Sequence, residues 1–385
     1  MVVQRKSSRD PRVYGPAGKL AKGWAVLRTP LDTTPLRIYP HEDRAPWSLN
    51  WLPNHALLRT VAQINPDIVH LHWIGGGFVP LHSLHMLHRP LVWTLHDMWA
   101  FTGGCHLDDG CGRYVDRCGA CPQLGSTRQW DLSRMVWQAK SRSWRKVQLS
   151  IVSPSRWLAG EAAKSSLLQN SPIHVIPNGL DLDAFKPLDK HLARNALRLP
   201  QGGHLLIFGA MGATEDRRKG FSMLLEALQR LRNATSSKLH IAVFGATSGG
   251  PLPDIPFPMH FLGHLHDDCS LALLYSAADV MVVPSRQENL ANTIMEALAC
   301  GTPVVAFDAG GNSDLIDHRE NGYLALANDA QDMADGIAWV LDDPQRHCYL
   351  STQARLKCER LFNIESIAQR HATLYSELLD SGKRP

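Results

Sequence analysis

Glu288 and Glu296 are the residues of this chain best suited to hold a ligand that carries both hydroxyls and phosphates. An apolar strand predicted at 279–283 is followed by a polar turn with Glu288, and then by a helix with Glu296 that stops at Gly301. Ligands of open α/β sheets bind beyond the carboxyl ends of strands, and the first amides of a helix favour anions. A sugar nucleotide fits a carboxylate beside bare amides.

Thr293 and Glu296 also have the spacing of a capping box, in which the glutamate only satisfies the end of its own helix. Under that alternative Glu296 has no ligand. Glu288 has no comparable role in helix geometry, so it carries the ligand hypothesis more firmly than Glu296 does.

Three cations, Arg217, Arg218 and Lys219, precede Gly220 and a predicted helix at 221–232. The helix dipole disfavours cations at this end unless they share an anion. The run therefore indicates a diphosphate site, with a solvent-facing charge run as the alternative.

His96 and Asp97 end a strand predicted at 90–97. A histidine at the carboxyl end of a strand can bond a sugar hydroxyl or act on a reacting centre. The alternative is a histidine that only packs or binds backbone.

Four cysteines fall within 17 residues: Cys105, Cys111, Cys118 and Cys121. A Cys-x2-Cys pair with two further thiols predicts a structural zinc that staples a long loop. The first two cysteines have five residues between them rather than two to four, so His106 could replace one thiol. A disulfide pair is the other alternative.

The composition is that of a globular protein, with 385 residues, 44% hydrophobic and 20% charged residues, and a net charge of +4. This charge is too small to argue for nucleic acid as a partner. The first 22 residues hold six Lys or Arg and one Asp, which predicts a solvated, disordered arm or a contact with phosphate headgroups at a membrane surface. No apolar run has the length of a membrane span or signal peptide, so we expect a cytoplasmic location, with a peripheral site on the inner membrane face as the alternative.

Strands alternate with helices along most of the chain, with a polar stretch at 183–203 that predicts a linker. This order predicts an α/β protein with two Rossmann-like, doubly wound domains facing across a cleft. We place the first domain at 1–180 and the second at 181–363, with a helix at 364–385 packing back on the first. Residues 1–60 show no strand followed by a glycine turn, so we expect the first domain to lack its first βα unit.

Four motifs over residues 60–380 resemble those of the retaining glycosyltransferases of the GT-B fold, in the fourth sequence family. The resemblance is closest to exopolysaccharide enzymes of the colanic-acid type. Its motifs are Glu288-x7-Glu296, Arg218-Lys219-Gly220, the run Trp-Thr-Leu-His-Asp-Met-Trp at 93–99 followed by the cysteine loop, and Ile-Pro-Asn-Gly-Leu-Asp at 176–181.

The resemblance implies that Lys219, with Arg218, holds the diphosphate of a nucleoside-diphosphate sugar and stabilises the leaving group. Many relatives carry an arginine soon after the first strand of the second domain. Ala210 and Ala213 occupy that region here, so Arg217 is expected to substitute for it.

The resemblance also implies that Glu296 bonds the ribose, that Glu288 and the amides of Asn289 and Leu290 contact the transferred sugar, and that His96 lies beside the anomeric carbon. Catalysis needs no cofactor. The expected reaction moves a sugar, with retention, to a saccharide or lipid-linked acceptor in surface polysaccharide synthesis. A sugar-nucleotide epimerase and a binding protein without turnover are the alternatives. The central expectation is that Lys219 and Glu296 meet at the strand ends to grip one activated sugar.

Overall fold

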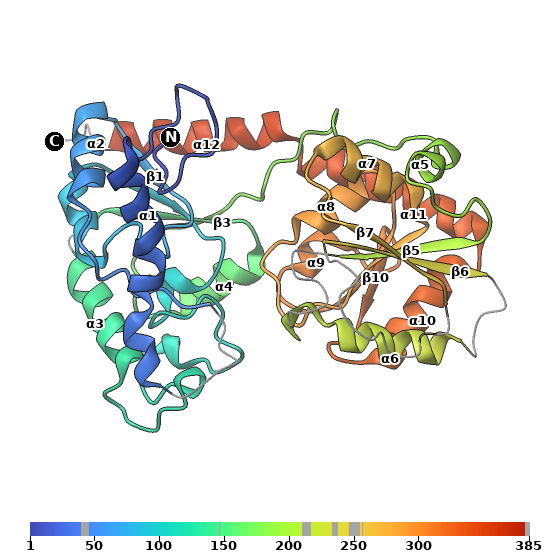
Figure 1. Cartoon of the computed structure of the whole chain (residues 1–385), viewed down its shortest axis with the longest axis horizontal. Helices are drawn as coiled ribbons and strands as arrows, with labels where there is room; N and C mark the ends of the chain where they lie inside the picture. Colours follow the sequence, from blue (N-terminus) through green and yellow to red (C-terminus); the bar gives the residue numbers. More distant parts are fainter. Residues whose placement is uncertain are drawn as a thin grey trace. The chain divides into compact units, whose positions relative to one another are not determined.

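The computed structural model describes residues 1–39, 46–145, 147–209, 217–232, 238–245, 255 and 257–381. The chain divides into two compact units (Figure 1). Unit 1 comprises Met1–Val175 and the chain from Thr373 onward, and unit 2 comprises Ile176–Ala372. Helix α12 (Ile364–Ser381) therefore begins in unit 2 and ends in unit 1.

Unit 1 is built on a four-stranded parallel sheet in the order β1-β2-β3-β4. The strands are β1 (Val69–Leu71), β2 (Leu91–Thr94), β3 (Leu149–Ser153) and β4 (Ile173–Val175). The two central strands, β2 and β3, are buried along their whole length, as expected for parallel strands covered on both faces. Within the described residues, no strand precedes β1.

Helices and 3-10 turns connect and cover these strands, and α3 packs against η2. The helices of unit 1 are α1 (Lys19–Asp32), η1 (Thr34–Ile38), α2 (His55–Ile64), η2 (Leu81–Leu87), η3 (Trp99–Phe101), η4 (Arg113–Val115), η5 (Pro122–Leu124), α3 (Leu132–Trp144) and α4 (Arg156–Lys164).

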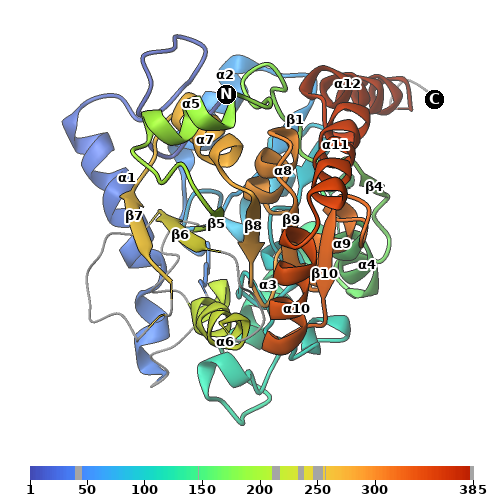
Figure 2. The same cartoon turned by 90° about the vertical axis from the view of Figure 1, so that its right-hand side faces the viewer.

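Unit 2 holds a six-stranded parallel sheet in the order β10-β9-β8-β5-β6-β7, which Figure 2 shows strand by strand. Its strands are β5 (His204–Gly209), β6 (Leu239–Phe244), β7 (Met259–Gly263), β8 (Val280–Val283), β9 (Val304–Phe307) and β10 (Gly322–Ala325). The chain adds strands outward from β5 on one side and from β8 on the other. The topological switch point therefore lies between β5 and β8, where open α/β sheets bind their ligands.

Two hydrophobic cores cover the two faces of this sheet. One includes residues of α5, α7, α8 and α11, and the other residues of α6 and α10. Figure 1 shows α7 and α8 on one face of the sheet and α6 and α10 on the other. The helices of unit 2 are α5 (Lys190–Ala196), η6 (Arg217–Lys219), α6 (Phe221–Leu231), α7 (Asp268–Ala277), α8 (Asn292–Ala299), α9 (Asn312–Leu315), α10 (Ala330–Leu341) and α11 (Pro344–Leu361). The predicted pair of parallel-sheet α/β domains is confirmed.

Two segments differ from their sequence-based predictions. The basic N-terminal segment is not a disordered arm, because Val2 bridges Tyr14 and α1 begins at Lys19. The buried Arg28 of α1 donates hydrogen bonds to the carbonyls of Leu52, Pro53 and Gly77. Local composition missed this because the partners are distant in sequence.

The stretch at 183–203 is not an unpacked linker. It contains α5, and Phe185, Ala193 and Leu199 are buried in a core of unit 2. These few buried apolar residues hold the segment in the core although most of its residues are polar.

Among the described residues, none of the helices combines the length and apolarity required to cross a membrane.

Candidate active site

Three loops of unit 2 meet beyond the carboxyl ends of neighbouring strands β5, β8 and β9. The loop after β5 carries Lys219, the loop after β8 carries Glu288, and the loop after β9 carries Gly310. Contacts between these loops bring the three residues together at the switch point.

Lys219 and Glu288 form an ion pair, with Nζ of Lys219 2.6 Å from Oε1 of Glu288. The two side chains are 28% and 18% exposed, so water reaches the pair only in part. An ammonium on a flexible stem can move from this carboxylate to a phosphate oxygen. The predicted cation is thus held at the switch point by the predicted sugar-binding carboxylate.

Gly220 brings the cationic loop against the loop after β8. Its φ is +71°, and a Cβ there would lie 1.9 Å from the carbonyl oxygen of Pro284. The amide of Arg286 donates to the carbonyl of Arg218 at 3.0 Å. Only glycine permits this backbone approach, which explains why it follows Arg218-Lys219.

Gly310 has the same role for the loop after β9. Its φ is +61°, and a Cβ there would lie 1.9 Å from the carbonyl oxygen of Glu288. That carbonyl accepts a hydrogen bond from the amide of Gly311 at 2.9 Å. The backbone of Glu288 is therefore fixed independently of its side chain.

The N-terminus of α8 is not closed by a capping box. The N-cap is Ala291, which has no side-chain acceptor, and Thr293 is the second residue of the helix. The carboxylate of Glu296 accepts a hydrogen bond of 2.7 Å from the hydroxyl of Tyr275 on α7. The capping-box alternative is therefore wrong, because the helix starts two residues too early for Thr293 to be its N-cap.

Burial raises the pKa of Glu296 above its usual value, an effect that the hydrogen bond from Tyr275 opposes. Tyr275 itself is fully buried and was not identified from the sequence, since a tyrosine within an apolar helix resembles a core residue. It orients the carboxylate and leaves acceptor capacity for a ligand hydroxyl.

The predicted meeting of Lys219 and Glu296 at one ligand stays a prediction, because each side chain bonds to a different partner, Glu288 and Tyr275. Leu290 is buried in a core of unit 2 and anchors the loop between the two glutamates. The side chain of Arg217, and Ala210 and Ala213, lie outside the described residues.

In unit 1, His96 follows β2 and its Nε2 lies 3.0 Å from Nδ1 of His72, which follows β1. Partial desolvation lowers the pKa of His96, and the nearby Asp97 opposes this effect. The Asp97 carboxylate is bonded to Nδ1 of His106 at 2.6 Å and to the amide of Trp99 at 2.8 Å. Asp97 is thus a structural residue, whereas the His96 ring is exposed.

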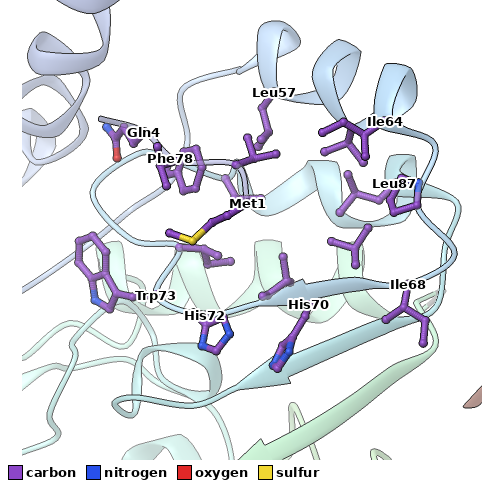
Figure 3. A pocket seen from close by; sticks show the side chains of 18 residues that line it. Met1, Gln4, Leu57, Ile64, Ile68, His70, His72, Trp73, Phe78 and Leu87 are labelled. Atoms are coloured by element: carbon purple, nitrogen blue, oxygen red, sulfur yellow. The ribbon is translucent and has the colours of Figure 1, made fainter. Parts of the chain in front are cut away.

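A cavity of about 730 Å³ lies beside β1 and is mostly apolar (Figure 3). Leu57 and Ile64 of α2 line it, together with Phe78, His70 of β1 and His72, which follows β1. A small hollow lined by His96 shares His72 with this cavity. His72 therefore borders both spaces, a placement that no sequence motif indicated.

The four cysteines of the loop lie in unit 1, and three of them, Cys105, Cys118 and Cys121, are buried. All eight cysteines are unpaired thiols, so the disulfide alternative is wrong, and the described part of the chain has no group of three or more His, Cys, Asp or Glu placed to hold a metal. Burial raises the pKa of Cys118 to about 12 and that of Cys121 to about 11, and it also raises the pKa of Cys105 and Cys111. Protonated, buried thiols pack as small apolar groups. The zinc assignment stays a prediction without geometric support.

Both halves of the chain match glycosyltransferase families. Residues 12–184 match the family described as Glycosyltransferase Family 4, and residues 203–343 match Glycosyl transferases group 1. A D-inositol 3-phosphate glycosyltransferase of Thermobispora bispora is 29% identical over 341 residues, which cover 84% of this chain and 74% of that relative. Two relatives of the same description from Catenulispora acidiphila are matched over only about half of their length, 51% and 53%.

Solved structures show the same fold. Sucrose-phosphate synthase from Thermosynechococcus elongatus aligns with a TM-score of 0.61 and 23% identity, over 86% of this chain and 81% of that one. Anabaena HepE in complex with UDP and glucose aligns with a TM-score of 0.61 and 19% identity, over 84% and 82%. These structural matches show the GT-B fold. The family matches support glycosyl transfer as the class of activity.

Proposed function

We propose that this chain, which has the GT-B fold of the group 1 and family 4 glycosyltransferases, transfers a sugar with retention from a nucleoside-diphosphate sugar to an acceptor hydroxyl. The observation that carries the proposal is the Lys219–Glu288 ion pair at the switch point of unit 2, between two glycine-dependent backbone contacts. A cation and a carboxylate on one rigid platform match the two ends of an activated sugar.

Donor binding rearranges this ion pair. The ammonium of Lys219, with Arg218, bonds the diphosphate, and the freed carboxylate of Glu288 accepts bonds from sugar hydroxyls. The amides of Asn289 and Leu290 contribute to the sugar site, and Glu296, oriented by Tyr275, accepts a bond from the ribose. Arg217 is retained as a further diphosphate ligand on the resemblance alone.

In the proposed reaction, the bond between the anomeric carbon and the diphosphate oxygen breaks while the acceptor oxygen bonds to the same face of that carbon. The acceptor proton passes to the departing diphosphate oxygen. Lys219 stabilises the charge that develops there, so catalysis needs no cofactor. His96 is the residue of unit 1 that we propose acts beside the anomeric carbon.

Two acceptor classes have separate support. The motif at 93–99 with its cysteine loop resembles exopolysaccharide enzymes and favours a saccharide or lipid-linked acceptor. The curated relatives are described as D-inositol 3-phosphate glycosyltransferases and favour a polyol phosphate. Assays with UDP-sugars against each class separate the two.

Lys219→Ala tests the phosphate assignment. Charge-assisted hydrogen bonds contribute ~1.5–3 kcal/mol, so we expect UDP to bind about 10- to 150-fold more weakly, as measured by calorimetry. Lys186→Ala is the matched control, because Lys186 is an exposed lysine of the same unit. Equal UDP affinity in the two variants would refute the assignment.

The reaction class is tested by measuring free nucleoside diphosphate. A glycosyltransferase releases it in step with glycosylation of an acceptor. An epimerase changes the sugar without an acceptor, and a binding protein shows donor affinity without turnover for any acceptor.

A further inference from the structure

His72 and His96 share one hydrogen bond between ring nitrogens, Nδ1 of His72 and Nε2 of His96, at 3.0 Å. Their rings are stacked, with centroids 5.3 Å apart and planes at 26°. The bond holds a single proton, so one ring donates and the other accepts. The tautomer of His96 therefore depends on His72.

Nδ1 is the ring nitrogen of His96 left for a ligand, because within the part of the chain that the structure describes only Nε2 is engaged. If His72 donates, Nδ1 of His96 carries a proton and can donate to a sugar hydroxyl. If His96 donates, its Nδ1 is a bare acceptor. The neighbour thus sets what His96 presents to substrate.

We propose that His72 is a positioning residue for His96, which fixes the orientation and the protonated nitrogen of the His96 ring in the transfer reaction. The link of this inference to catalysis rests on the proposed function. The coupling of the two rings rests on their hydrogen bond alone.

Two other polar side chains near the pair, those of Asp97 and His70, are bonded to other partners, so the positioning role falls to His72. The Asp97 carboxylate is already bonded to His106 and to the amide of Trp99. His70, whose ring centroid lies 4.3 Å from that of His72, has both nitrogens engaged, Nδ1 with Tyr375 and Nε2 with Thr94. His70 therefore forms a fixed ring against which His72 packs.

The neighbouring titratable groups also define the expected pH response. Asp97 favours the charged form of His96, and desolvation opposes it. A neutral His72 accepts a bond from a protonated His96 and so favours that form too. Without the His72 ring as acceptor, the pKa of His96 should be lower.

Two variants of His72 and one control test the inference. His72→Phe keeps a stacked ring without a hydrogen bond, and His72→Asn keeps a polar group near the position of Nδ1. His82→Phe is the control, because His82 is an exposed histidine on η2. We expect His72→Phe to lower kcat about tenfold and to shift the acidic limb of the pH–rate profile to lower pH, with UDP affinity unchanged and most of kcat retained in His72→Asn.

NMR of ¹⁵N-labelled histidine provides a readout that does not need turnover. We expect the imidazole shifts of His96 to report a changed tautomer balance and a lower titration midpoint in His72→Phe, but not in His82→Phe. A His96 titration identical in both variants would overturn the proposal, whatever happens to kcat or stability. If no donor and acceptor support turnover, the proposed function fails while the NMR result still decides the coupling.

Discussion

The ion pair of Lys219 with Glu288 keeps a cation at the switch point of unit 2 before any ligand binds. An isolated lysine among the amides of a helix N-terminus would be repelled by the helix dipole. The carboxylate of Glu288 offsets this repulsion in the free protein, and a diphosphate would do so in the complex. Under the proposed function, the same residues therefore stabilise the free protein and bind the donor.

Glu296 carries a cost in stability. Below the ordinary pKa of a glutamate, the side chain is neutral in both the folded and the unfolded chain and has no effect. Because the pKa of the folded form is raised, the unfolded chain ionises first as the pH rises above the ordinary value, and stability falls until the folded form ionises as well. We expect Glu296→Gln to raise the Tm at pH 8, with the gain vanishing near pH 4, and to weaken UDP-sugar binding.

The control for this prediction is Glu377→Gln, at an exposed position of α12. Calorimetric Tm values across pH 4 to 8 provide the measurement. A lower Tm for Glu296→Gln at pH 8 would show that the carboxylate is stabilised by its contacts rather than destabilised by burial.

Individual residues of the site were readable from the sequence to different degrees. Lys219 and Glu288 were identifiable as candidates because each breaks a local expectation, a cation before a helix and a carboxylate after a strand. Glu296 was a weaker candidate, because a capping box could also explain it. Tyr275 and His72 were not, because a tyrosine in an apolar helix and a histidine at the end of an apolar strand look like core residues. Their roles arise from contacts across 21 and 24 positions of the chain.

At the scale of elements, the site depends on loops that touch through backbone atoms. The strand order places β9, β8 and β5 side by side, and Gly220 and Gly310 let the following loops approach within contact of a carbonyl. Side-chain chemistry alone would not hold Glu288 at its position. The glycines are therefore part of the site although they offer no functional group.

Gly310→Ala tests this dependence. A left-handed residue other than glycine costs roughly 1–2 kcal/mol, and overpacking against the carbonyl of Glu288 adds about 1–3 kcal/mol. Gly112→Ala is the matched control, since its φ of +63° is close to the +61° of Gly310 and nothing lies within 4 Å of its added Cβ. Urea unfolding should show a larger loss for Gly310→Ala, with UDP binding lost only there. An equal loss of unfolding free energy in the two variants would mean that the loop after β9 accommodates the added methyl group without cost.

At the scale of the whole molecule, α12 joins the two units by belonging to both. Its part in unit 1 includes the buried Leu374 and the Tyr375 hydroxyl bonded to His70 at 2.5 Å. The C-terminal helix thus completes a unit whose other residues come from the opposite end of the chain.

A chain ended at Ala372 should therefore lose stability in unit 1 and keep it in unit 2. The loss of a buried leucine costs about 2–5 kcal/mol. Tryptophan fluorescence follows unit 1 almost alone, because ten of the 11 tryptophans lie there and only Trp339 lies in unit 2. A chain ended at Ser381 is the control. If tryptophan fluorescence gives the same unfolding temperature for the chains ended at Ala372 and at Ser381, the assignment of the end of α12 to unit 1 is contradicted.

The sequence by itself determined the parallel α/β architecture, the strands that precede His96 and Glu288, and the oppositely charged residues around the switch point. It could do so because apolar runs, glycine turns and misplaced charges are local signals. Only the tertiary structure decided that Lys219 pairs with Glu288, that Tyr275 holds Glu296, that His72 bonds His96, and that the cysteines of the loop form no disulfide. These outcomes depend on side-chain directions and on distances between segments far apart in the chain, which no local pattern encodes.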